Sequence, residues 1–176
     1  YESRFAENGH LEETLQQLQA PLGVFSINGN HEYRANWIAK RQWIRKFSTL
    51  LKDSVASPDN SFYLIGRDDF VNKKRKSLHE LMAGIDTTKP IIVLDHQPWS
   101  FAEMRMNRVD LGLHGHTHNG QLWPYPIVMK WIYECPFGYY QKGGVQHFVS
   151  CGYRCAGPAY RVGTRSEIVV LHIQFK

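Results

Sequence analysis

Two histidines in a glycine-bounded turn, His116 and His118, are the strongest candidates for chemistry in this sequence. They follow the apolar run 109–114, which predicts a buried strand. Imidazole is a common metal ligand, and in a turn directly after a strand two imidazoles can converge on one point. The same turn could equally carry two polar histidines that bind nothing, so this motif alone leaves both interpretations open.

A second candidate follows the predicted strand 22–27, where the sequence reads GNHE. Asn30 offers an amide oxygen, which suits a hard metal ion. His31 could act as a general acid near neutral pH. Taken alone, the segment is better interpreted as an Asn-containing turn followed by a helix cap.

The third candidate, His96, follows the continuous apolar run 91–94, which predicts a strand covered on both faces. The alternative is a histidine at the edge of the core that is paired with Asp95. Open α/β sheets carry their chemistry at the ends of such strands. Three strand ends together offer one amide and four imidazoles, and this coincidence predicts a shared site.

Helical and apolar segments alternate along the chain, which predicts an α/β fold. The strand 167–175 is expected to close a second sheet. Arg67, at the end of one strand, could bind phosphate or fix its loop, and the structural role is favoured. The expected helices are 11–19, 36–52, 77–84 and 101–107; the expected strands are 22–27, 62–65, 91–94, 109–114, 145–150 and 167–175; 53–60 is expected to be a loop.

The 176 residues suit one domain, 1–176, with an ordinary globular composition of 43% hydrophobic and 21% charged residues. The net charge of +5 favours anionic partners without selecting one. The basic segment 36–52 could bind nucleic acid, but a solvated face is the better interpretation. No apolar run approaches the ~20 residues that span a bilayer.

The sequence contains three cysteines, and an odd count argues against a full disulfide framework, so we expect small, partly buried thiols. The segment 122–137 is rich in Trp, Tyr and Pro. We expect it to form a covering lobe, or an apolar surface near the mouth of the site that could contact a lipid or a partner. Packing into a core is the commoner use of such residues.

The chain resembles the calcineurin-like metallophosphoesterases in the sequences GNHE, DHQP and GHTH at its three strand ends. The resemblance is closest to a bacterial, membrane-associated phosphodiesterase-like branch, through the segments 64–69, 115–121 and 161–168. It implies two facing mixed β-sheets flanked by helices around a pair of divalent ions, commonly Mn, Fe or Zn. By the same resemblance Asn30, His96 and His116 ligate one ion and His118 the other. His31 would protonate the leaving oxygen or steady the phosphoryl group.

The family's opening motifs, Asp-x-His and Gly-Asp-x-x-Asp, do not occur in this sequence, where every Asp lies at or after Asp53. We therefore expect a domain that lacks its first βαβ portion, with a partial or empty metal site. The parent protein would be a membrane-associated bacterial phosphoesterase, and this chain would be inactive. An unpaired sheet edge would favour a dimer.

Three functional alternatives stay open at this stage. The leading one is metal-dependent hydrolysis of a phosphate ester, with a diester favoured over a phosphoprotein and a nucleotide-linked lipid as a narrower variant. The second is a non-catalytic binding or scaffold module that keeps part of the metal site. The third, a nucleic-acid binder, rests on charge alone, and no specific nucleic acid is expected.

Overall fold

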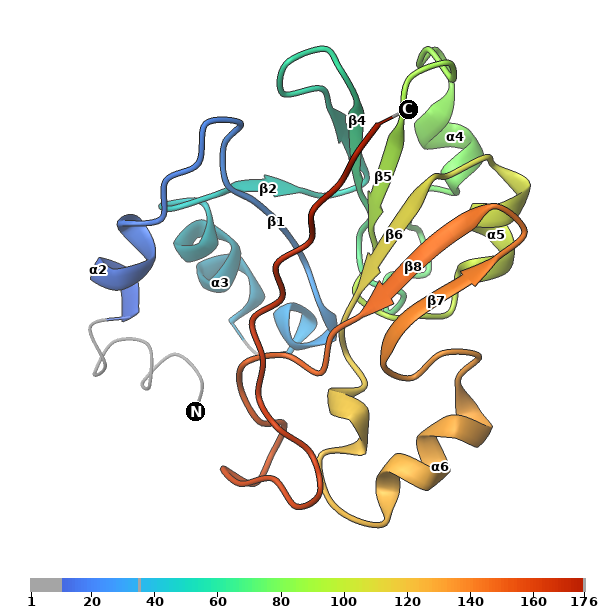
Figure 1. Ribbon diagram of the computed structural model, residues 1–176. Coiled ribbons are helices and arrows are strands. Elements are labelled where there is room, and N and C mark those ends of the chain that lie inside the picture. The colour runs from blue at the N-terminus through green and yellow to red at the C-terminus, as the bar shows by residue number, and fades with distance from the viewer. Residues whose placement is uncertain (1–10, 35, 176) are drawn as a thin grey trace.

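The computed structural model describes residues 11–34 and 36–175 and is built on a six-stranded mixed sheet (Figure 1). The strand order is β3-β4-β5-β6-β8-β7. Strands β4, β5, β6 and β8 run parallel, and β3 and β7 are antiparallel edges. The bounds are β3 Ser54–Ala56, β4 Tyr63–Gly66, β5 Ile91–Leu94, β6 Leu111–His114, β7 Gly138–Lys142 and β8 Val145–Val149.

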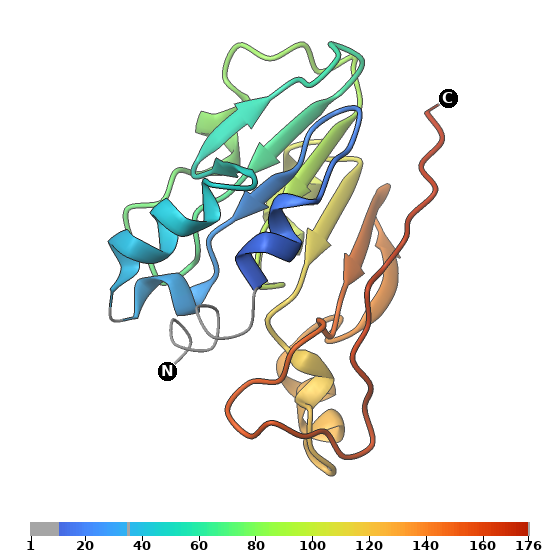
Figure 2. The same ribbon diagram turned by 90° about the vertical axis from the view of Figure 1, so that its left-hand side faces the viewer.

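A second, parallel sheet consists of β1 (Phe25–Ile27) and β2 (Thr49–Leu51). Apolar side chains of this sheet pack on those of the large sheet, with Leu51, Leu64 and Ile92 at the centre of the contact. Figure 2 shows the two layers from the side. The expected α/β fold with two sheets is therefore confirmed, although the smaller sheet is wholly parallel rather than mixed.

Short helices flank the sheets. On the far face of the large sheet, Ile65 and Val93 pack against Leu78 of α4 and Met104 of α5, all fully buried. A capping box at Ser77 starts α4. The α-helices are α2 Leu11–Gln16, α3 Trp37–Ile44, α4 Leu78–Met82, α5 Phe101–Met106 and α6 Tyr125–Ile132, and two 3₁₀ helices are η1 Asn30–Tyr33 and η2 His118–Gly120.

The helix expected over 36–52 is wrong in its second half. It ends at Ile44, and Thr49–Leu51 forms β2 beside β1. Within α3 the aromatic Trp37 is 45% exposed, and Arg41 is the buried residue. The Arg41 guanidinium lies 4.5 Å from the ring centroid of Trp37, which covers it.

Two strands were not expected. The segment 53–60, expected to be a loop, contains β3, and β7 lies in a stretch for which we expected no strand. β7 and β8 form a hairpin joined by Gly143 and Gly144, both in the left-handed backbone region.

The strand expected over 167–175 is wrong. This stretch is extended but belongs to no sheet, and it crosses in front of the strands (Figure 1). It is held at one end by the Glu167 amide, which donates to the Gly152 carbonyl, and at the other by Phe175 packed on Phe62. Ile168 is 81% exposed as a result.

All three cysteines are free thiols, and burial raises the pKa of Cys135 and Cys151. Among residues 11–34 and 36–175 we found no helix with the length and apolar character needed to cross a membrane.

Candidate metal centre

The three strand ends meet at one place. β5 and β6 are parallel neighbours, so the turns that carry His96 and His116 lie at the same edge of the large sheet. The Gly115 amide donates to the His96 carbonyl at 2.9 Å and ties these turns together. β1 ends beside the same edge (Figure 1), and η1, which begins with Asn30 and His31, follows it.

Asn30 and His96 are in direct contact. The amide Oδ1 of Asn30 lies 3.2 Å from Nε2 of His96, although the two residues are 66 positions apart. Two ligands about 2.1 Å from one ion and at right angles are about 3.0 Å apart, and at a tetrahedral angle about 3.4 Å apart. The observed separation therefore fits a pair of ligands on a single ion.

His116 completes this group. Its ring centroid lies 5.2 Å from that of His96, with the planes at 78°. Imidazoles that share an ion hold their centroids about 4.5–5.5 Å apart, given a metal–nitrogen distance near 2.1 Å. Burial lowers the pKa of His96 to about 3, helped by His116, His118 and His31. Both rings are therefore neutral at pH 7 and keep a lone pair for a ligand, because burial lowers the pKa of His116 as well.

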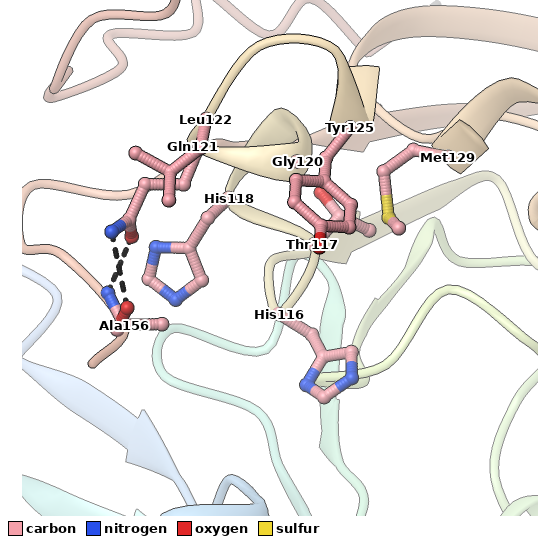
Figure 3. A pocket seen from close by; sticks show the side chains of 9 residues that line it. All are labelled: His116, Thr117, His118, Gly120, Gln121, Leu122, Tyr125, Met129 and Ala156. Carbon is pink, nitrogen blue, oxygen red and sulfur yellow. Dashed lines mark hydrogen bonds between the residues drawn. The ribbon is translucent and has the colours of Figure 1, made fainter. Parts of the chain in front are cut away.

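His118 lies on the other side of the turn (Figure 3). Burial and the neighbouring Arg161 lower its pKa, with smaller effects from His116 and His31. The Arg161 guanidinium donates to the His118 carbonyl at 3.1 Å and to the Cys151 carbonyl at 2.8 Å. Sequence reasoning missed this role of Arg161, and only its place in the segment 161–168 could have suggested it.

The loop that presents Asn30 is fixed by polar contacts. The Glu32 carboxylate accepts from the Gly29 amide at 2.8 Å, so the last residue of GNHE holds the turn. Lys40 donates to the His31 carbonyl at 2.7 Å. The preceding Asn28 is fully buried, and its side chain donates to Asp68 at 2.8 Å.

Asp68 is the centre of this support. Its buried carboxylate accepts from Asn28, Tyr33 and Asn72, with Lys52 at 3.7 Å. Burial acts to raise the pKa of Asp68, but these donors outweigh it and the pKa is lowered. Burial and the same carboxylate raise the pKa of Tyr33 to about 12. The site loop after β1 is therefore anchored on an ionised aspartate after β4.

Arg67, Asp69 and Asp95 have similar supporting roles. Arg67 is buried and donates to Glu103 at 2.6 Å and to Asp95 at 3.4 Å, which supports its structural role. Asp69 accepts from Gln97 at 2.9 Å and favours the charged form of the nearby His116. The Asp95 carboxylate accepts from Arg67 and from Arg75, at 3.1 Å, and His96 contacts Asn30 instead.

The donors fit one divalent ion at Asn30, His96 and His116, because they are neutral nitrogen and oxygen ligands already at ligand spacing. Within residues 11–34 and 36–175, however, no three His, Cys, Asp or Glu side chains form a ready-made metal site. A pocket of about 290 Å³ opens beside His116 and His118 (Figure 3). Leu122, Tyr125 and Met129 form its apolar wall.

An α/β domain of two layers, with an amide and histidines at neighbouring strand ends, offers donors of the kind that hold a metal ion. The family model of the calcineurin-like phosphoesterases matches residues 5–120, and the chain belongs to this family. No solved structure matched the chain significantly.

Its relatives come from bacteria and from animals. A metallophosphoesterase of Aquifex aeolicus is 31% identical over 175 residues, 95% of this chain and 67% of the relative. One from Campylobacter jejuni is 30% identical over 168 residues, 92% of this chain and 45% of the relative. A bovine "transmembrane protein with metallophosphoesterase domain" is 30% identical over 183 residues, 91% of this chain and 40% of the relative. The chain thus spans less than half the length of several relatives that it matches.

Proposed function

We propose that this chain carries part of the active site of a phosphoester hydrolase that acts with two divalent ions. Asn30, His96 and His116 hold one ion, and His118 contributes to the second. The single observation that carries the proposal is the 3.2 Å contact between Asn30 Oδ1 and His96 Nε2, which joins two distant strand ends at ligand spacing.

Divalent ions, when bound, supply a nucleophile near neutral pH and neutralise charge on the phosphoryl group. The chain's own contribution is orientation and proton transfer. His31 follows Asn30 directly and affects the pKa of His96, His116 and His118, which supports a position at the same pocket. In this proposal His31 donates a proton to the leaving oxygen or holds the phosphoryl group.

Ligand number sets the expected activity. By the family resemblance one ion keeps three protein ligands in this chain and the other keeps only His118. We therefore expect weak binding of Mn, Fe or Zn and little turnover by this chain. The substrate class we favour is a phosphate diester, in line with the resemblance described above.

Calorimetric titration with Mn²⁺ and Zn²⁺, beside an assay on bis(p-nitrophenyl) phosphate, tests the proposal. His96→Ala should abolish the binding of the three-ligand ion. His31→Ala should keep metal binding and lower the residual turnover by about 10²–10⁴-fold. Fast turnover by the present chain would contradict its expected inactivity, and unchanged metal binding in His96→Ala would contradict the ligand assignment.

A second candidate is a non-catalytic module that retains a partial metal site. It is favoured by the lack of any ready group of three His, Cys, Asp or Glu ligands in the part of the chain that the structure describes. Metal binding with no detectable turnover would support this candidate over hydrolysis.

The apolar pocket wall favours a narrower form of the enzymatic proposal. Leu122, Tyr125 and Met129 lie beside His118 and could accept the acyl part of a nucleotide-linked lipid. Detergent added to the diesterase assay tests this narrower form. A detergent tail that occupies the apolar wall should compete with a lipid-linked substrate, whereas hydrolysis of a fully polar diester should be unaffected.

A further inference from the structure

The end of the molecule beside the pocket is an exposed aromatic surface. It is formed by α6 and by the loop 152–163, which lie together at the bottom of both ribbon views (Figures 1 and 2). The Gln121 side chain joins the two segments, because it donates to the Ala156 carbonyl at 3.0 Å and accepts from the Ala156 amide. We call this surface the aromatic end; its large exposed side chains are Trp123, Tyr125, Ile127, Trp131, Ile132, Tyr153, Tyr160 and Val162.

Helix α6 is apolar but does not pack into the core. It has eight residues, seven of them apolar or aromatic, and none of them is buried. Trp131 is 81% exposed and Trp123, just before the helix, 62%. Packing into a core, the commoner use of such residues, is therefore wrong for α6. A helix that exposes large apolar side chains in this way indicates an interaction site.

The charge of the aromatic end has one sign. Helix α6 and the loop 152–163 contain no Asp or Glu and three basic residues, Lys130, Arg154 and Arg161, and Arg165 follows the loop. The exposed Glu134, two residues beyond α6, is paired with Lys142 at 2.8 Å. Arg161 is committed to backbone carbonyls near His118. Lys130, Arg154 and Arg165 are exposed at the surface.

We propose that the aromatic end docks on the surface of an anionic lipid bilayer. Trp and Tyr settle at the level of the headgroups, where one side of the ring is apolar and the other is wet. Exposed Lys and Arg beside them meet the negative surface potential of anionic lipids. A surface with basic residues and no acids complements a uniformly negative membrane.

Docking in this orientation brings the pocket to the lipid. Tyr125 and Met129 belong both to α6 and to the pocket wall, whose other side carries His118. The site would therefore face molecules held at the membrane surface. Docking needs neither a metal ion nor hydrolysis, so it can be tested, and can fail, independently of the function proposed above.

Co-sedimentation of the full 176-residue chain with vesicles tests the proposal. We expect binding to phosphatidylcholine vesicles that contain about one third phosphatidylglycerol, and weaker binding when salt is raised. The double variant Trp123→Ser, Trp131→Ser should bind at least about tenfold more weakly. Lys130→Glu should bind about thirtyfold more weakly to the anionic vesicles and almost unchanged to phosphatidylcholine alone.

Met106→Ser is the matched control, because Met106 is 79% exposed but lies at the end of α5. It should bind as the unmodified protein does, and circular dichroism should show that all variants are folded. The proposal is overturned if the unmodified protein does not sediment with anionic vesicles, or if Met106→Ser weakens binding as much as the tryptophan variant. It is also overturned if Trp131 drives self-association without vesicle binding, which would assign the surface to a second copy of the chain.

Discussion

Replacing Gly29 with alanine should weaken metal binding without removing any ligand. Gly29 has φ −104°, a conformation open to any residue, so alanine introduces no backbone strain there. Its added Cβ would lie 2.9 Å from both Cδ2 and Nε2 of His96. The imidazole is thus pressed at the nitrogen that faces Asn30.

The size of the effect follows from this contact. Non-bonded carbon atoms prefer about 3.5 Å, so the ring must retreat by about 0.6 Å. Metal–ligand distances tolerate only about 0.2 Å. Without an ion the ring can move, whereas a bound ion holds it in the strained position. Overpacking costs about 1–3 kcal/mol, which corresponds to a metal dissociation constant about 5- to 150-fold higher.

Calorimetric titration with Mn²⁺ measures this change, and thermal unfolding without metal should shift little. Gly115→Ala is the matched control, because its Cβ would lie 3.7 Å from Nδ1 of the same imidazole, an ordinary contact. The reasoning is refuted if Gly29→Ala binds Mn²⁺ as tightly as the unmodified chain, or if Gly115→Ala loses as much affinity.

Three further predictions concern stability and assembly. Asp68→Ala leaves buried donors such as Asn28 without an acceptor. It should lower the free energy of unfolding by about 1–3 kcal/mol for each such donor in denaturant titration, whereas the exposed Asp86→Ala should leave it nearly unchanged. Burial lowers the pKa of His147 to about 4. The stability that this neutral histidine contributes is therefore complete above the unfolded pKa of 6.5 and is lost as the pH falls toward 4. His147→Asn should flatten that part of the stability–pH profile, and the exposed His79→Asn should not. The two-stranded sheet β1-β2 leaves strand edges without partners in the described part of the chain, so light scattering at high concentration should detect dimers, and a strictly monomeric protein would count against edge pairing.

Much of the fold could be predicted because its central strands are short apolar runs followed by polar turns. The runs that became β1, β4, β5, β6 and β8 were all recognised from this pattern. Parallel strands have their ends at one edge, so the convergence of His96 and His116 could be expected from the topology alone.

The wrong predictions of strands and helices have a common cause. A strand forms only beside a partner strand, and the local sequence pattern does not show whether a partner is present. Thr49–Leu51 continues a helical spacing, yet pairing with Phe25–Ile27 makes it β2. The stretch 167–175 contains alternating apolar residues but has no neighbouring strand among the described residues. For β7, the pair Gly143–Gly144 was a hairpin signal that could have revealed it.

The supporting residues of the site could not be predicted from the sequence. Asp68 and Arg161 act through contacts with partners 35 and 43 positions away in the chain, Tyr33 and His118. Nothing in local spacing relates such residues. Their types alone, a carboxylate and a guanidinium near strand ends, do not distinguish a supporting role from ligand or phosphate binding.

The central claim is that Asn30, His96 and His116 share one divalent ion. Crystals grown with Mn²⁺ and measured for anomalous scattering test it most directly. We predict a peak about 2.0–2.4 Å from Asn30 Oδ1 and from one ring nitrogen of each histidine. A map with full Mn²⁺ occupancy elsewhere and no peak among these three side chains would contradict the account.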